Sequence, residues 1–250
     1  MESEQARMAA AIRAAAAYRP DPDRPSVVLS LPFEGPWLAV NSPARRIPSH
    51  GTHFLGQTYA IDFVAVDTRG RTGTVVDWRT ALATEPVERF VGYGAPILAP
   101  ADGQVVLVHD GEPDHEARRS PVTALPYLLT QRSRLRRGLG AITGNHAILA
   151  LAEGGPYVAL AHLRPGSLRV AAGDRVRVGQ LIAACGNSGN STQPHVHIQV
   201  MDSADLLTAR GLPMAFRDYR AWPRGGKGQP SWVSQGVPDH RQRVEASSAP

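Results

Sequence analysis

Short apolar runs of strand length, separated by turn residues, occupy most of the chain between residues 26 and 201. Runs of this length bounded by Gly, Pro, Asn or Asp are typical of an antiparallel sheet or sandwich. We therefore predict a mainly β fold. The predicted strands are Val27–Leu29, Tyr59–Val66, Pro96–Ala99, Gln104–His109, Ala147–Ala152, Val158–Leu163, Arg175–Val178, Leu181–Ala184 and Val196–Met201.

Several segments do not follow this pattern of short strands and turns, and they define the expected domain organisation. An alanine-rich start followed by prolines predicts a short helix and a linker over residues 1–25, ahead of a single β domain over residues 26–237. Residues 111–143 read as an arginine-rich, partly helical insertion between two strands, and a further short helix is predicted around Trp78–Phe90. Residues 238–250 are predicted to form a flexible tail.

Composition narrows the function classes. The chain has 250 residues, a net charge of +5 and one cysteine, so it can form neither an intrachain disulfide nor a cysteine-rich zinc knuckle. Cys185 lies among small apolar residues and is expected to be buried. All but one of the 27 basic residues are arginine, a bias that points to genome composition, and we expect no nucleic-acid partner. We also expect no membrane partner, because no apolar run reaches about 18 residues.

The strongest chemical signal is the segment His195-Val196-His197-Ile198-Gln199-Val200. Strand alternation places His195, His197 and Gln199 on one face and the apolar side chains on the other. Two imidazoles about 6–7 Å apart on one strand face can bracket a single ion and its bound water. The alternative is a pair of surface histidines on a half-exposed strand. A third imidazole, His162, lies in the predicted strand upstream.

The surrounding motifs resemble the lysostaphin-like zinc endopeptidases, which cut peptidoglycan cross-bridges. The matching pieces, in order, are Tyr93–Val106 (YGAPILAPADGQVV), Gly144–His146 (GNH), Ala161–Leu163 (AHL), Gly173–Val176 (GDRV), Gly179–Ile182 (GQLI) and Gly186–His197 (GNSGNSTQPHVH), with Asp62 as a weaker anchor. Their order makes a chance match improbable. The resemblance implies a core of the duplicated-hybrid-motif type.

The resemblance also implies a set of roles. One zinc ion would be bound by Asp62 and His197, while His195 and His162 would be the catalytic imidazoles. Three protein ligands and a water molecule form the open arrangement of a catalytic zinc. The metal lowers the pKa of the water, one imidazole can take its proton, and the other can stabilise the oxyanion.

The third protein ligand departs from the family pattern. The family places a histidine four residues before the aspartate, where this chain has Thr58. We predict that His50 supplies the missing ligand, with His53 as the substitute, because the glycines between these histidines and Asp62 permit the chain to fold back. The remaining alternative is that neither histidine binds and the site is incomplete.

These observations predict a zinc-dependent metalloendopeptidase that hydrolyses peptide bonds of bacterial cell-wall peptidoglycan. The competing hypothesis is a catalytically degenerate module of the same fold that binds cell wall or activates a partner hydrolase. The sequence shows no export signal, whereas the resemblance implies the cell envelope or the extracellular space, so localisation stays open.

Overall fold

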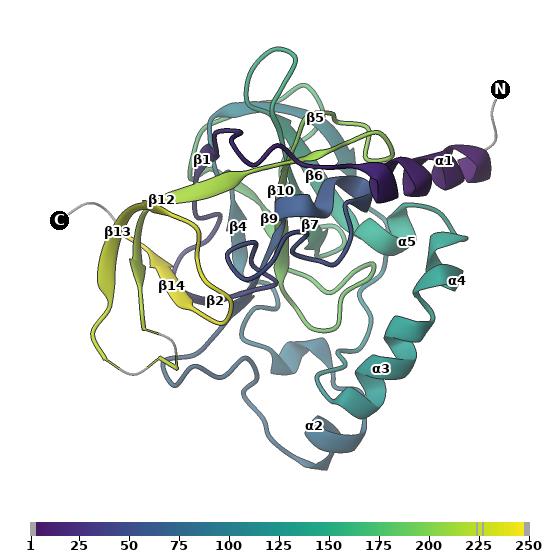
Figure 1. Cartoon of the computed structure of the whole chain (residues 1–250). Helices are drawn as coiled ribbons and strands as arrows, with labels where there is room; N and C mark the ends of the chain where they lie inside the picture. The colour runs from purple at the N-terminus through teal and green to yellow at the C-terminus, as the bar shows by residue number, and fades with distance from the viewer. Residues whose placement is uncertain (1–3, 224, 227, 248–250) are drawn as a thin grey trace.

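The structure, a computed structural model, describes residues 4–223, 225–226 and 228–247 (Figure 1). Its helices are α1 (Glu4–Ala17), α2 (Trp78–Leu82), α3 (Pro121–Leu129), α4 (Gln131–Leu135) and α5 (Gly140–Thr143), with 3₁₀ turns η1 (Phe54–Tyr59) and η2 (Val87–Arg89). Its strands are β1 (Val27–Ser30), β2 (Pro36–Val40), β3 (Ile61–Ala65), β4 (Pro96–Leu98), β5 (Gly103–His109), β6 (Asn145–Ala150), β7 (Tyr157–Leu163), β8 (Arg175–Val176), β9 (Leu181–Ala184), β10 (Val196–Met201), β11 (Gly211–Leu212), β12 (Met214–Ala221), β13 (Ser231–Gly236) and β14 (Arg243–Ala246).

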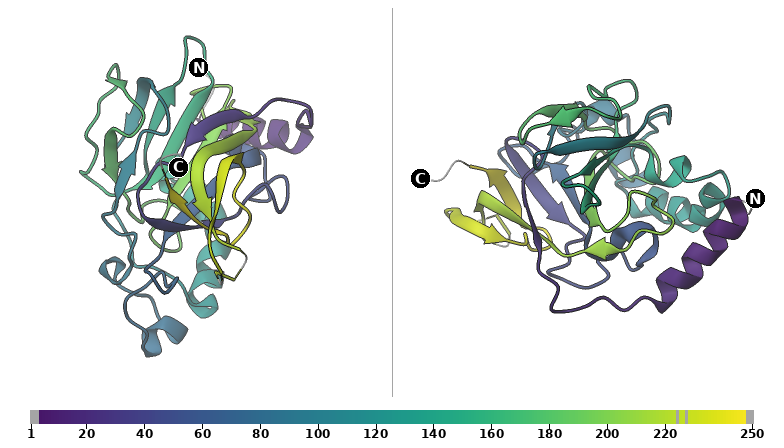
Figure 2. Two further views of the ribbon diagram at one scale, coloured as in Figure 1. Left: turned by 90° about the vertical axis from the view of Figure 1, so that its left-hand side faces the viewer. Right: turned by 90° about the horizontal axis from the view of Figure 1, so that it is seen from above.

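One large curled sheet dominates the molecule and confirms the mainly β prediction (Figure 2). Its strand order is β1-β12-β14-β2-β3-β10-β7-β6-β5-β8, with β11 and β13 beside this path, and β4 and β9 form a second small sheet. The pairing is antiparallel except between β1 and β12, which run parallel. Strands β3, β10 and β7 lie next to one another at the centre of the large sheet.

Alternation along the central strands separates core from site. In β3, Ile61 and Phe63 enter the main apolar cluster, and in β10, Val196 and Ile198 do the same. The intervening residues therefore project from the opposite face of the sheet. Burial of apolar side chains on one face thus fixes the register that turns the polar side chains of both strands to the other face.

Strand β7 breaks this alternation at His162. Val158 and Leu160 enter the core, so strict alternation would turn residue 162 toward the core as well. His162 instead has a positive φ of 62°, and Leu163 returns to the core. The left-handed residue places Ala161 and His162 together on the pocket side of the sheet.

The C-terminal region corrects the predicted flexible tail over residues 238–250. Strand β14 pairs with β12 and β2, and its Val244 is fully buried. The prediction was wrong because a four-residue strand with a single buried valine gives little periodic signal. Residues 248–250, like residues 1–3, lie outside the described residues.

The helical segments lie around the sheet rather than in its core. Helix α1 matches the predicted N-terminal helix, and α3, α4 and α5 make the insertion partly helical, as predicted. The helix expected around Trp78–Phe90 is shorter and ends at Leu82, where η2 follows. Among the described residues, no helix is both long and apolar enough to cross a membrane.

Candidate metal centre

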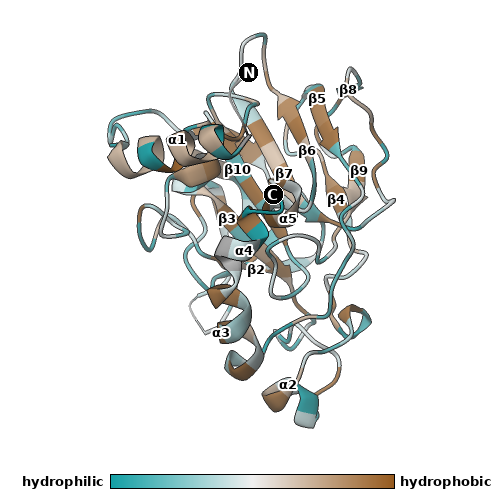
Figure 3. Cartoon of the chain, turned by 90° about the vertical axis from the view of Figure 1, so that its right-hand side faces the viewer, coloured by the Kyte–Doolittle hydropathy of each residue, from teal (hydrophilic) through white to brown (hydrophobic). Residues whose placement is uncertain are grey.

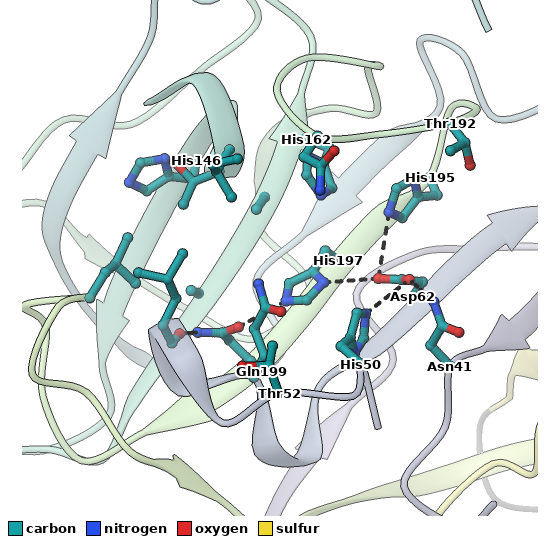
Figure 4. Close-up of a pocket in the computed structure, with 18 of the residues that line it drawn as sticks. Asn41, His50, Thr52, Asp62, His146, His162, Thr192, His195, His197 and Gln199 are labelled. Carbon is teal, nitrogen blue, oxygen red and sulfur yellow. Dashed lines mark hydrogen bonds and ion pairs between the residues drawn. The ribbon is translucent and has the colours of Figure 1, made fainter. Parts of the chain in front are cut away.

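Three potential metal ligands converge at the centre of the large sheet (Figure 4). Asp62 of β3 lies directly opposite His197 of β10, and its Oδ1 is 2.8 Å from His197 Nδ1. The Nε2 atom of His50 is 3.0 Å from Asp62 Oδ2. One ligand atom from each residue lies within 4.8 Å of the other two, a spacing that fits a single ion.

A folded-back loop brings His50 to the strands. The backbone N–H of Ser49 donates to the carbonyl of Thr58, which closes the loop over the intervening residues. Within it, Gly56 has a φ of 76°, and a Cβ at this position would lie 2.9 Å from Met201 Cγ. Only glycine fits here, because the loop both turns left-handed and lies directly on β10.

The structure separates the two candidate histidines. His50 reaches Asp62, as predicted, whereas His53 turns away and its Nδ1 lies 3.0 Å from Thr58 Oγ1. The ring of His53 packs edge-on against Tyr18, which follows helix α1. His53 therefore does not belong to the cluster, and Thr58 contacts His53 rather than the potential ligands.

His50 and His197 each make a hydrogen bond through the ring nitrogen that faces away from Asp62, and these bonds fix the tautomers of the two rings. The amide nitrogen of Gln199 donates to the carbonyl of Leu55, so the amide oxygen of Gln199 faces His197 and accepts from Nε2–H at 2.8 Å. Likewise, Ser49 Oγ donates to the carbonyl of Gln57 and accepts from the Nδ1–H of His50.

The ring nitrogens that face Asp62, His50 Nε2 and His197 Nδ1, therefore present lone pairs to its carboxylate. A carboxylate and two imidazole lone pairs are all acceptors, so no proton of their own fills the space between them. Asn41 donates from its amide nitrogen to Asp62 Oδ2 at 2.7 Å and orients the carboxylate. Three convergent acceptors whose outer atoms are already bonded fit a divalent cation such as zinc.

Two further imidazoles lie beside the cluster. His195 Nε2 is 3.5 Å from Asp62 Oδ1, and the rings of His162 and His195 have centroids 4.7 Å apart. The Nδ1–H of His195 donates to the carbonyl of Gln193, and that of His162 donates to the carbonyl of Ser188, both at 2.8 Å. A carbonyl can only accept, so in the neutral form both rings carry a free lone pair at Nε2.

Burial and neighbouring charges shift the pKa values of the buried titratable groups in different directions. Burial opposes ionisation of Asp62, but the neighbouring His50 and His195 outweigh it and hold the pKa of Asp62 well below 3.8. Burial, together with the nearby His195 and His197, holds the pKa of His162 well below 6.5. For His195, burial also opposes the charged form, yet the Asp62 carboxylate prevails and raises the pKa.

A pocket of about 260 Å³ opens over these side chains. One wall comes from the insertion and from the loop before β10, through Leu128, Ile142 and Asn190. His146 lies on the same wall, apart from the ligand cluster (Figure 4). The pocket is therefore polar at its floor and partly apolar at its sides.

All five predicted site residues reach this pocket. His50, Asp62 and His197 form the ligand cluster, while His162 and His195 stand beside it. Asn41 and Ser49 also contact the cluster, each through one hydrogen bond, and neither was predicted from the sequence. Neither residue belongs to a motif, so only the loop geometry could have identified them.

A comparison with family models finds one match, within the second half of the domain. Residues 134–208 match the model of peptidase family M23. The predicted family resemblance is confirmed. This M23 segment carries His162, His195 and His197, whereas His50 and Asp62 lie before it and are brought to it by β3 and the η1 loop.

Solved M23-type structures show only a distant likeness. The catalytic domain of lysostaphin from Staphylococcus simulans is 21% identical, with 61% of this chain and 74% of that chain covered and a TM-score of 0.35. LytU is 21% identical over 78% of this chain and 87% of its own, with a TM-score of 0.36. The catalytic domain of the prophage-encoded M23 protein EnpA from Enterococcus faecalis, an A109H mutant, is 22% identical over 57% of this chain and 81% of its own, with a TM-score of 0.33. No curated protein matches the chain.

Proposed function

We propose that this chain is a zinc-dependent endopeptidase that hydrolyses peptide bonds of bacterial cell-wall peptidoglycan. The observation that supports it most directly is the convergence of His50, Asp62 and His197, with their outer atoms already hydrogen-bonded. The M23 match supports a peptidase, and the peptidoglycan substrate comes from the resemblance. The proposed location is the cell envelope or the extracellular space, where that substrate lies.

The metal would be held by His50 Nε2, Asp62 and His197 Nδ1. When bound, zinc acidifies a water molecule and polarises the scissile carbonyl. Ser49 and Gln199 would keep the two histidines oriented, because each bonds the ring nitrogen that faces away from the metal. Asn41 would orient the carboxylate through its hydrogen bond to Asp62 Oδ2.

His195 is placed to move the proton of the attacking water. Its Nδ1–H is anchored on the carbonyl of Gln193, so Nε2 faces the centre as an acceptor. After taking the proton, the same nitrogen can donate it to the leaving amine. The raised pKa of His195 favours this protonated intermediate form.

His162 faces the pocket from β7 and is placed to stabilise the developing oxyanion. Because its Nδ1–H is bonded to the carbonyl of Ser188, donation to an oxyanion requires a second proton on Nε2, which would be taken up from solvent in the pocket. Burial keeps the resting ring neutral, and a neighbouring anion favours its protonation as charge develops.

Metal content and hydrolysis of purified peptidoglycan test the proposal together. We expect about one zinc per chain, as one catalytic site requires, and release of new amino groups from peptidoglycan. Asp62→Ala should lose both zinc and hydrolysis, whereas His195→Ala should keep zinc and lose hydrolysis. Zinc binding without hydrolysis of peptidoglycan or of any short glycine-rich peptide would support the degenerate module instead. Absence of bound zinc after reconstitution would falsify the metal site.

A further inference from the structure

Helices α2 and α3 display a concentration of exposed apolar side chains. Between 60% and 76% of the surface of each of these side chains is exposed. They are Trp78 and Leu82 of α2, and Val122, Leu125 and Leu129 of α3. Neither helix buries any of its residues, and Figure 3 shows hydrophobic residues (brown) along both helices where they project below the sheet. Scattered exposed apolar residues are ordinary, but a contiguous group marks a contact surface.

The spacing within α3 makes this surface one-sided. Val122, Leu125 and Leu129 recur at i, i+3 and i+7, so they share one face of the helix. Tyr127 points the other way and donates its hydroxyl to the carbonyl of Gly189, in the loop before β10. The inner face of α3 thus holds the helix on the domain, and the outer apolar face has no role in the fold.

Buried polar contacts join the two helices into one unit, which we name the α2–α3 arm (α2, α3 and the connecting contacts at Glu85 and Arg119). Glu85 is fully buried and accepts two hydrogen bonds from the Arg119 guanidinium, at 2.7 and 3.0 Å. Arg119 also donates to Thr80 of α2, and the Ser120 hydroxyl donates to the carbonyl of Ala81. These contacts hold the apolar side chains of α2 and α3 in a fixed relation.

Positive charge is concentrated in the later part of the insertion, after Glu112, Asp114 and Glu116. Residues 117–143 contain six arginines and no aspartate or glutamate. Arg136 and Arg137 are exposed beyond α4, and the Arg79 guanidinium lies 5.4 Å from the ring centroid of the exposed Trp78. An exposed tryptophan, exposed aliphatic side chains and the exposed Arg136 and Arg137 together match the boundary between anionic headgroups and acyl chains.

We propose that the α2–α3 arm docks on an anionic lipid surface. The apolar outer face enters the interface, and Arg79, Arg136 and Arg137 contact the headgroup phosphates. This docking is peripheral, and it differs from the expectation of no membrane partner, which considered only spanning segments. Leu128 of α3 also lines the metal pocket, so docking places the mouth of the pocket beside the lipid surface.

Co-sedimentation of the full chain with vesicles tests the proposal without reference to catalysis. We expect binding to phosphatidylglycerol vesicles, a blue shift of tryptophan emission, little binding to phosphatidylcholine, and release at high salt. Leu125→Ser/Leu129→Ser and, separately, Arg136→Glu/Arg137→Glu should each reduce binding about tenfold or more. The matched control is Val178→Ser/Leu181→Ser, which removes two comparably apolar exposed side chains around β9 and should bind like the wild type.

Three results would overturn the proposal. The first is no binding to phosphatidylglycerol, or equal binding to both lipids. The second is unchanged binding by either arm variant. The third is a fall in oligomeric mass for Leu125→Ser/Leu129→Ser without an effect on vesicle binding, since a second copy of the chain would then be the occupant. Circular dichroism of each variant separates loss of docking from loss of folding.

Discussion

His162 combines a position in the pocket with a strained backbone. L-residues pay about 1–2 kcal/mol for the left-handed conformation, which glycine adopts freely. The φ of 62° nevertheless turns the imidazole out of the core and onto the pocket side. A glycine would relieve the strain but would remove the imidazole, so the residue type reflects the site rather than the strand.

This conflict predicts an unusual order of stability. His162→Gly should be more stable than His162→Ala by about 1 kcal/mol, because only glycine relaxes at positive φ. Urea denaturation of both variants measures the difference. At the neighbouring Ala161, replacement by glycine should be destabilising, as in an ordinary strand. If His162→Ala proved the more stable variant, the left-handed conformation would be wrong.

The two upstream histidines give a second prediction at this scale. His50→Ala removes a proposed ligand and should weaken zinc binding by at least about a hundredfold, since loss of an outer partner alone costs 10–100-fold. His53→Ala is the matched control and should keep zinc, because its ring contacts Tyr18 and Thr58 instead. Competition with a zinc-binding dye gives both affinities. Equal losses, or a loss only in His53→Ala, would contradict the assignment of His50.

At the scale of elements, the insertion supports the loop before β10, which carries His195 and contacts His162 through the carbonyl of Ser188. The Tyr127 ring lies between two guanidinium groups, with Arg134 3.7 Å and Arg118 4.2 Å from its centroid. Arg134 also donates to Asn190 Oδ1 at 2.7 Å. Helices α3 and α4 therefore fix the loop from which Ser188 anchors His162.

Because these contacts hold the loop and not the ligand cluster, their loss should affect turnover without affecting metal binding. Tyr127→Ala should lower the turnover number about tenfold or more while zinc content stays unchanged, because the loop but not the ligand cluster loses its contact. Tyr127→Phe keeps the stacked ring and should retain most of the activity. Tyr157→Phe, at the far end of β7 from His162, serves as the control. A simultaneous loss of zinc in Tyr127→Ala would show that the insertion acts on the fold as a whole.

The same elements show how far sequence reasoning could go. The alternation of β10 was sufficient to place His195 and His197 on one face, because apolar burial fixes that register. Alternation alone would have misplaced His162, and the short AHL motif located it only through the family resemblance. Strand β14 was missed since its stability comes from its two neighbours rather than from its own sequence.

At the scale of the whole molecule, buried imidazoles link folding to pH. Burial lowers the pKa of His146 below 6.5, and the nearby His109 lowers it further against the bond to the Gly144 carbonyl. The pKa of His162 is lowered in the same way, whereas that of His195 is raised. As the pH falls, protonation of His146 and His162 therefore lowers the stability of the folded state, whereas protonation of His195 raises it.

The lowered pKa of His146 sets the direction in which stability changes with pH. Its folded-state pKa lies below its unfolded value, so between those two values the unfolded chain binds more protons and stability falls as pH falls, by up to about 1.4 kcal/mol per pH unit. We expect His146→Gln, which has no such proton to take up, to lose less stability than the wild type between pH 7.5 and 5, a range in which Asp62 stays ionised because its pKa is lowered. Urea midpoints with a chelator present measure this difference without metal release. Parallel pH profiles for the two proteins would show that His146 titrates alike in the folded and unfolded chains, and its burial on the pocket wall would then carry no electrostatic cost.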